Sequence, residues 1–212
     1  MIFLKFGRTI STVILAALSV LVFAAARTVS ATPALPVRTV ALSGQPPTGT
    51  VSVESFQRFD RAPMINESGK VAFFAAPEFF PGEPFAGNTS VWSEGGGGLG
   101  LVVRQGIDAP GLSIGVQFDE FFDLAFNNAG QTVFRSRLAG ASVDSSNRES
   151  IWITGHQDLQ LLLCQGDVAP AVQDNAIIDA IVDPFTLSDA GQIAVALEVN
   201  GNGGIDPVTA GL

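Results

Sequence analysis

Several residue types are scarce in this chain, and each scarcity excludes a class of protein. The 212 residues include one cysteine and one histidine, so no disulfide can form within the chain and a Cys/His zinc site lacks ligands. Lys and Arg number 11 against 20 Asp and Glu, a net charge of −9, which argues against a nucleic-acid binder because such proteins need a basic face. With 15% charged and 47% hydrophobic residues, the chain is neither disordered nor a coiled coil.

The N-terminal residues have the pattern of a secretory signal peptide. Lys5 and Arg8 precede an uncharged run from Thr9 to Ala26, and Val29 and Ala31 satisfy the small-residue rule for cleavage. We therefore predict an apolar signal helix in residues 1–31, cleaved after Ala31. The alternative is an uncleaved anchor, since an uncharged run of this length is near the minimum that spans a bilayer.

Cleavage would leave an exported and more acidic protein. Residues 1–31 contain Lys5, Arg8 and Arg27 and no acid, so residues 32–212 carry 8 basic and 20 acidic residues, a net charge of −12. Such a charge keeps a protein soluble by self-repulsion. We expect a secreted or cell-envelope location, with membrane contact only through the signal segment during export.

One motif recurs three times in the mature part of the chain. Segment 66–73 (NESGKVAF) is followed at equal steps by 127–134 (NNAGQTVF) and 188–195 (SDAGQIAV). An Asx side chain can bond to the backbone two residues on, and glycine can adopt a positive φ at the end of a type I turn. The motif is therefore predicted to be a hairpin turn and not a catalytic loop. Its turn residues are Asn66, Gly69, Asn127, Gly130, Asp189 and Gly191.

Other landmarks keep nearly the same period and complete the repeat. Val91-Trp92 recurs one period later as Ile151-Trp152, and the leucine-rich stretch 99–103 recurs as 159–163. Gly106 and Pro110 recur as Gly166 and Pro170, and 40–44 is a degenerate earlier copy of this stretch. Four short strands per roughly 60 residues resemble one blade of a β-propeller. The predicted repeat core includes Phe73, Trp92, Phe134 and Trp152.

These observations predict an all-β domain over 32–212, made of four-stranded, propeller-blade-like repeats. The units lie around 38–65, 66–126 and 127–187, with a partial unit at 188–212. The exception is the helix-like run Asn175–Asp183. About two and a half units are fewer than the four to eight blades of a closed propeller, so we expect a fragment, an assembly of copies or an open array. Exposed sheet edges predict self-association.

The third unit is expected to be cut short. Leu212 stands as far after Gly191 as Ile151 stands after Gly130. The residue after Leu212 would therefore take the tryptophan position, and we expect the chain to stop where a strand should begin.

The three motif copies resemble a family of exported bacterial proteins named for tandem NxxGxxAF repeats, over roughly residues 38–212. Members carry C-terminal surface-sorting signals, often of the PEP-CTERM type. The first copy matches in full, the second has Val133 for Ala, and the third has Ser188 for Asn and Val195 for Phe. The chain has no apolar helix, basic tail or Pro-Glu-Pro element at its end, so it resembles a truncated member. The resemblance implies surface export and a β-repeat architecture but no activity, so no catalytic residue is carried over.

Two groups of residues suggest chemistry. His156 and Cys164 could form a nucleophilic pair, but they align with Gly96 and Arg104 of the previous repeat, so we expect a surface histidine and a strand-end thiol. Asp119, Glu120 and Asp123 could serve a glycosidase or bind Ca²⁺, although a solvated strand edge explains them better. These last three residues are the densest acidic cluster of the sequence.

Weaker signals favour structural interpretations. Residues 200–206 faintly resemble a calcium loop but lack its terminal glutamate, and Gly95–Gly98 lacks the lysine of a phosphate loop. Both are interpreted as turns. Trp92 and Trp152 could stack on sugars if exposed, but equivalent strand positions favour a core role. Sequons begin at Asn66 and Asn88 and matter only in a host that glycosylates.

We therefore expect a non-enzymatic exported protein with a structural or binding role in the cell envelope or at the surface, without a cofactor and with an unidentified partner. A carbohydrate-binding or carbohydrate-cleaving propeller fragment is one alternative. A calcium-dependent adhesion module is the other.

Overall fold

A computed structural model describes residues 37–46, 55–77, 89–154, 158–170, 175–200 and 208–211. The chain divides into two compact units, Met1–Arg38 and Thr39–Leu212. The predicted signal segment lies outside the described residues. Within the described part, the elements are all β-strands, which confirms the all-β expectation. No helix among these residues is long and apolar enough to cross a membrane.

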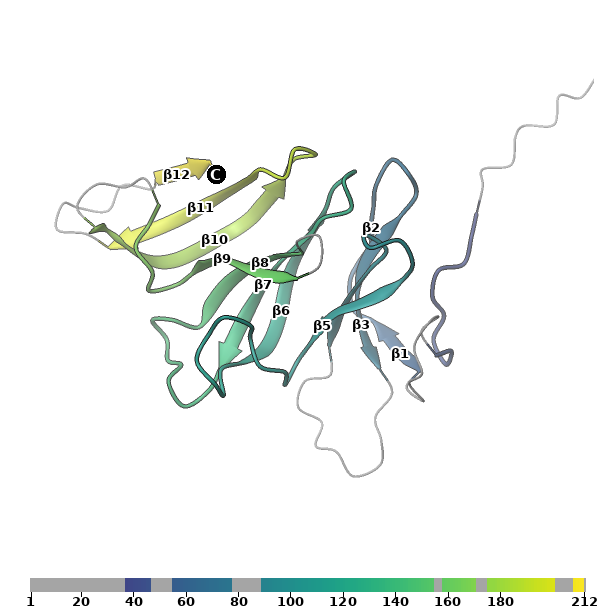
Figure 1. The fold of residues 1–212 in the computed structure, drawn as a ribbon, viewed down its shortest axis with the longest axis horizontal. Helices are drawn as coiled ribbons and strands as arrows, with labels where there is room; N and C mark the ends of the chain where they lie inside the picture. The colour runs from purple at the N-terminus through teal and green to yellow at the C-terminus, as the bar shows by residue number, and fades with distance from the viewer. Residues whose placement is uncertain are drawn as a thin grey trace, which may run out of the picture. The chain divides into compact units, whose positions relative to one another are not determined.

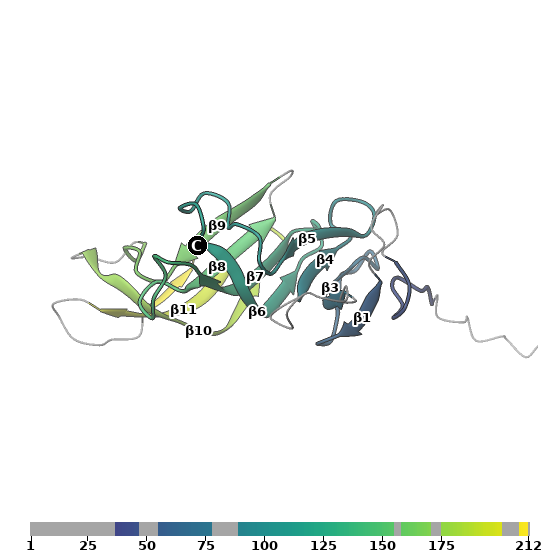
Figure 2. The ribbon, with the colours of Figure 1, turned by 90° about the horizontal axis from the view of Figure 1, so that it is seen from below.

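The strands form three antiparallel sheets, none of which is closed (Figures 1 and 2). In the second and third sheets the strands lie in chain order, and in the first the order is β1-β3-β4-β5 with β2 also paired to β3. The first sheet contains β1 (Phe56–Phe59), β2 (Met64–Ile65), β3 (Val71–Pro77), β4 (Ser90–Ser93) and β5 (Gly100–Arg104). The second contains β6 (Gln117–Phe126), β7 (Thr132–Ala139), β8 (Glu149–Thr154) and β9 (Leu159–Cys164). The third contains β10 (Ile177–Leu187), β11 (Ile193–Asn200) and β12 (Val208–Gly211).

The opening strand of each sheet is irregular at the same place. β1 and β2 both pair with β3 and act as two halves of one strand. The register of β6 against β7 shifts between Phe121 and Leu124, and that of β10 against β11 shifts between Val182 and Thr186. Each sheet therefore begins with the same kind of broken strand.

The run Asn175–Asp183, which looked helical in sequence, lies largely in β10. A register shift between Ile178 and Ala180 inserts an extra residue, so that Ile178 and Ile181 are both buried although they are three positions apart. Phe118 and Phe121 repeat this arrangement in β6. A β-bulge thus produces an apolar spacing that imitates a helix.

The expectation that the chain stops before its next strand was wrong. β12 pairs with β11, and Ala210 stands opposite Val195 as Trp152 stands opposite Phe134. Residues 201–207 separate β11 from β12, whereas the longer stretch 140–148 separates β7 from β8. In the third copy, β12 therefore begins earlier in the sequence than a constant repeat period predicts.

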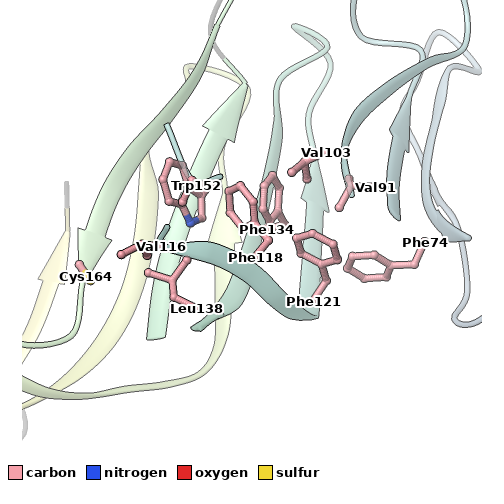
Figure 3. Packing of buried hydrophobic residues seen from close by; sticks show 11 residues of the cluster. Phe74, Val91, Val103, Val116, Phe118, Phe121, Phe134, Leu138, Trp152 and Cys164 are labelled. Atoms are coloured by element: carbon pink, nitrogen blue, oxygen red, sulfur yellow. The ribbon is translucent and has the colours of Figure 1, made fainter. Parts of the chain in front are cut away.

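Hydrophobic layers lie on both faces of the first two sheets. Phe74, Val91 and Val103 of the first sheet pack against Phe118 and Trp152 of the second, and Figure 3 shows these side chains meeting between the strands. The opposite face of the second sheet packs against the third sheet. A smaller cluster, with Phe56, Phe73, Ala75 and Trp92, covers the other face of the first sheet.

Candidate functional site

The three copies of the motif form turns of one geometry. The N–H of Asn66 donates to the Lys70 carbonyl at 3.0 Å, and the N–H of Gly69 donates to the Asn66 carbonyl at 2.9 Å. The same two bonds form in the turns that begin at Asn127 and Ser188. This is a three-residue hairpin loop with a type I turn and a glycine bulge. The φ angles of Gly69, Gly130 and Gly191 are 75°, 85° and 82°.

The first side chain of each turn accepts a hydrogen bond from the backbone four residues on. Asn66 Oδ1 accepts from Lys70 N at 3.0 Å, and Asn127 Oδ1 accepts from Gln131 N at 2.8 Å. Ser188 Oγ accepts from Gln192 N at 3.0 Å. The observed backbone donor lies four residues on, because the three-residue loop brings the fifth residue opposite the first. Serine can replace asparagine in this contact because only an acceptor is needed.

The asparagine amides also join each turn to the next. Asn66 Nδ2 donates to the carbonyl of Asn127 at 3.1 Å, and Asn127 Nδ2 donates to the carbonyl of Ser188 at 2.9 Å. Both bonds connect residues 61 positions apart. The first position of the motif is therefore a link between successive sheets as well as part of a turn.

The second position of the motif makes a parallel row of bonds. The N–H of Glu67 donates to Asn128 Oδ1 at 2.8 Å, and the N–H of Asn128 donates to Asp189 Oδ1 at 2.9 Å. Asn128 Nδ2 also donates to Asp189 Oδ2 at 2.8 Å. The backbone and side-chain bonds from Asn128 lower the pKa of Asp189. We call these two rows, formed by residues 66–67, 127–128 and 188–189, the turn ladder.

Glycine permits a close approach beside this ladder. A Cβ atom on Gly95, in the turn between β4 and β5, would lie 1.9 Å from the carbonyl oxygen of Gly130. A Cβ atom on Gly130 would lie 2.9 Å from the carbonyl oxygen of Gly95, whereas one on Gly69 would meet nothing within 4 Å. The glycine-rich turn 95–98 therefore packs against the motif turn of the second sheet.

Two glutamines that sequence reasoning missed link the sheets beyond the ladder. Gln165 Nε2 donates to the carbonyl of Asp179 in β10 at 2.7 Å, and Gln105 Nε2 donates to the carbonyl of Asp119 in β6. Each Oε1 also accepts a backbone N–H of its own sheet, from Thr89 for Gln105 and from Glu149 for Gln165. The signal was present as the pattern Gln-Gly-x-x-Ala-Pro at 105–110 and again at 165–170.

Both tryptophans lie in the interior. Trp92 is 4% exposed and Trp152 is 0% exposed. Each indole N–H donates to a serine hydroxyl two residues earlier at 2.9 Å, and each ring packs edge-to-face on a phenylalanine at 5.0 Å, on Phe56 and Phe118 respectively. Phe73 and Phe134 are also buried. These rings therefore offer no surface on which a sugar could stack.

The acidic cluster faces arginines. Glu120 pairs with Arg137 at 2.7 Å, and Asp123 lies 4.0 Å from Arg135. Both guanidinium groups lie 5.1 Å from the ring of Phe122. Asp119 is exposed on β6, an edge strand of its sheet. Among the described residues, no group of three His, Cys, Asp or Glu side chains could hold a metal ion.

Cys164 is buried at the end of β9, where its thiol donates to the carbonyl of Asn147 at 3.6 Å. Burial, and secondarily the charge of Asp167, raises the pKa of Cys164 to about 11. A thiol that stays protonated at neutral pH is a poor nucleophile. His156, Asn88 and residues 201–206 lie outside the described part of the chain.

A cavity of about 640 Å³ adjoins the turn ladder between the first and second sheets. Its lining includes the glycine-rich turn and the residues Gln131, Thr154, Asp158 and Leu159. The hydroxyls of Ser93 and Thr154 in this lining both accept hydrogen bonds from Thr132 at 2.8 Å, the first from its hydroxyl and the second from its N–H. The contacts described in this region therefore hold strands and sheets together.

Comparison with known proteins gives a family without an assigned role. Residues 23–177 match the model of a family described as a family of unknown function (DUF7453). No curated protein and no solved structure matches the chain. Because the match covers well over half of the sequence, the chain belongs to this family of unknown function, DUF7453.

Proposed function

We propose that this protein is an exported, non-enzymatic β-repeat scaffold of the bacterial cell envelope or surface, built from propeller-like units of about 60 residues. Its role is structural or binding, and the repeated sheets form a rigid support for loops that differ between copies.

The turn ladder carries this proposal. Residues that recur in sequence bond one turn to the next, as Asn66 and Asn127 do, or fill the interior, as Trp92 and Trp152 do. An enzyme built on repeats would place unlike polar groups at one point, as a catalytic site requires. Here the repeated polar groups satisfy one another.

The binding role is assigned to the opposite end of the second sheet. The loop 140–148 joins β7 to β8 there, and it is ordered by its own polar contacts. Asp144 Oδ1 accepts from the backbone and hydroxyl of Ser146 at 2.7 and 2.6 Å, and Asn147 Oδ1 accepts from the N–H of Asp144 at 2.8 Å. Asp144 and Ser146 are exposed, and the loop differs in sequence from the corresponding stretch of the first copy, as a partner-specific surface requires.

Export is tested with a reporter. Residues 1–45 are fused to an alkaline phosphatase that folds only where disulfides form, outside the cytoplasm. We expect an active fusion whose mature N-terminus is Thr32, and an inactive fusion when Lys5 and Arg8 are changed to Glu. An inactive wild-type fusion that keeps residues 1–31 would refute the proposal.

A further inference from the structure

The junction between the first and second sheets differs from the next junction at one pair of facing residues. Ser93 of β4 and Thr132 of β7 meet there, and the Thr132 hydroxyl donates to Ser93 Oγ at 2.8 Å. One repeat later the same positions hold Ile153 and Ile193, which are buried in the apolar cluster between the second and third sheets. An isoleucine pair therefore fills one junction, whereas in the other junction a hydroxyl pair borders the cavity of about 640 Å³.

The hydroxyl of Ser93 has a proton to donate into this cavity. Its oxygen accepts from the N–H of Gly95 at 3.0 Å and from the hydroxyl of Thr132, which occupies both acceptor positions of a hydroxyl. Ser93 is 7% exposed and lines the cavity, and no group in the described part of the chain accepts its proton. Because a buried donor without an acceptor is unfavourable, an occupant that carries an oxygen acceptor would stabilise this wall.

Thr154 supplies a second hydroxyl donor close to the first. Its oxygen accepts from the N–H of Thr132 at 2.8 Å, so its own proton remains to be donated. Thr154 lies two residues after Trp152 in β8, and alternate side chains of a strand share a face. Trp152 packs in the core between the first two sheets, so the Thr154 side chain points toward the first sheet. Thr132 thus holds both donors at the cavity.

The rest of the lining combines apolar side chains, open backbone and one charge. Val102 of β5 and Leu159 of β9 are half-buried and pack against the core between the two sheets. Gly96 and Gly98 leave backbone accessible, because a Cβ atom on either would meet nothing within 4 Å. Asp158 is exposed, and among the described residues that line the cavity it is the only charged one.

These groups favour a neutral ligand that both accepts and donates hydrogen bonds. An ammonium group has no acceptor, so it would leave the hydroxyl protons of Ser93 and Thr154 unsatisfied. A carboxylate or phosphate would meet Asp158 in a protein of net charge −9, with no Lys or Arg among the described lining residues to offset the repulsion. A sugar ring has oxygen acceptors, hydroxyls that a carboxylate can accept, and C–H groups that pack on aliphatic side chains.

We propose that this cavity binds a neutral saccharide of the size of a mono- or disaccharide. Ser93 and Thr154 donate to its oxygens, Asp158 accepts from its hydroxyls, and Val102 and Leu159 contact its C–H groups. The cavity volume lies within the range of about 300–1,000 Å³ that is typical of small-molecule sites. The site lies at the opposite end of the second sheet from the loop 140–148, so it is separate from the binding surface proposed above.

Backbone amide shifts in NMR titrations of the full chain test this assignment. The probes are glucose, galactose, mannose, cellobiose, maltose and lactose, with glycylglycine and putrescine as peptide and amine comparisons. We expect at least one sugar to shift the amides of Gly96, Gly98 and Asp158 in a saturable way. If none of the sugars shifts these amides, or if glycylglycine or putrescine binds there more tightly than every sugar, the saccharide assignment is overturned.

Substitutions of the proposed donors and acceptor locate the binding. Ser93→Ala should raise the Kd of the bound sugar by roughly threefold to tenfold, the value of one hydrogen bond. Asp158→Ala should raise it by roughly tenfold or more, because bonds to a charged group are stronger. Ser136→Ala is the control: its hydroxyl is also buried in the second sheet, where it bonds to Ser150 at 2.9 Å, but it does not line the cavity. Equal Kd values in all three variants would overturn the site.

A double substitution uses the second junction as a template. Ser93→Ile/Thr132→Ile places in the first junction the pair that Ile153 and Ile193 form in the second. It removes the Ser93 donor and fills the space beside it, so we expect sugar binding to be lost. Tryptophan fluorescence reports whether the variant keeps Trp152 buried. A folded double variant that binds the sugar as tightly as the wild type would contradict the proposal, and if this variant does not fold, the single substitutions decide.

Discussion

The turns that begin at Asn66 and Asn127 have the same internal hydrogen bonds but different surroundings. The Asn127 turn accepts a bond from Asn66, donates one to Ser188, and contacts Gly95 through Gly130. In the Asn66 turn, a Cβ atom on Gly69 would meet nothing within 4 Å. The motif therefore encodes a local turn everywhere, and it encodes sheet stacking only where a neighbouring turn is present. Matched substitutions in the two turns can separate these two roles.

The largest loss of folding stability is expected from a substitution at Gly95. Gly95→Ala would place a Cβ atom 1.9 Å from the Gly130 carbonyl oxygen, and this backbone contact can be relieved only by separating the two sheets. We expect a loss of about 3 kcal/mol or more in the free energy of unfolding, measured by urea denaturation. Gly96→Ala, which meets nothing within 4 Å, is the control. Equal stability of the two variants would contradict the close approach.

The second-largest loss of stability distinguishes backbone strain within a turn from the packing of one sheet on the next. Gly130→Ala and Gly69→Ala both place alanine at a positive φ, which costs about 1 kcal/mol. Gly130→Ala also brings Cβ to 2.9 Å from the Gly95 carbonyl oxygen, so it should lower the free energy of unfolding by roughly 1–2 kcal/mol more. Thermal and urea unfolding of both variants provide the measurement. If Gly69→Ala were the more damaging, the stacking role would be refuted.

A smaller difference is expected between the two asparagines. Asn127 is buried and bonds to Ser188 and Gln131, whereas Asn66 is half-buried. We expect Asn127→Ala to lower the free energy of unfolding by about 2 kcal/mol and Asn66→Ala by about 1 kcal/mol. Asn127→Ser keeps an acceptor for Gln131 and should recover part of the loss. Full recovery by serine would show that the link to Ser188 contributes nothing.

The smallest effect concerns acid stability. The bonds from Asn128 lower the pKa of Asp189 below its ordinary value, so ionised Asp189 favours the folded state above the unfolded pKa of about 4. This contribution is lost as the pH falls through the lower, folded-state pKa. Acid unfolding followed by tryptophan fluorescence should show the wild type losing stability relative to Asp189→Asn below about pH 4. Parallel acid curves for the two proteins would contradict the ladder contact.

Much of the fold was readable from the sequence because it depends on local chemistry. The even spacing of the motif located turns at Gly69, Gly130 and Gly191, since glycine at positive φ is a local requirement. The helix-like run at 175–183 was misleading because a bulge in β10 shifts the apolar spacing. The strand β12 was missed because a shorter connection breaks the constant period.

The hydrogen bonds between sheets could not be predicted from the sequence of a single turn. Nothing in one turn shows that the amide of Asn127 reaches the carbonyl of Ser188 in the next copy of the motif. The glutamine links of Gln105 and Gln165 have a sequence signal, but their partners in β6 and β10 come from the next sheet. Contacts between repeats follow from how the sheets stack, which the sequence of one repeat does not specify.

Amide hydrogen exchange at two neighbouring positions tests the turn ladder most directly. The N–H of Asn128 donates to the next turn through Asp189, whereas the N–H of Gln131 donates within its own turn to Asn127. In Asp189→Ala we expect Asn128 to lose its protection and Gln131 to keep it. If Asn128 exchanged as fast in the wild type as in the variant, successive turns would not be bonded and the account of this protein as a stack of linked sheets would fail.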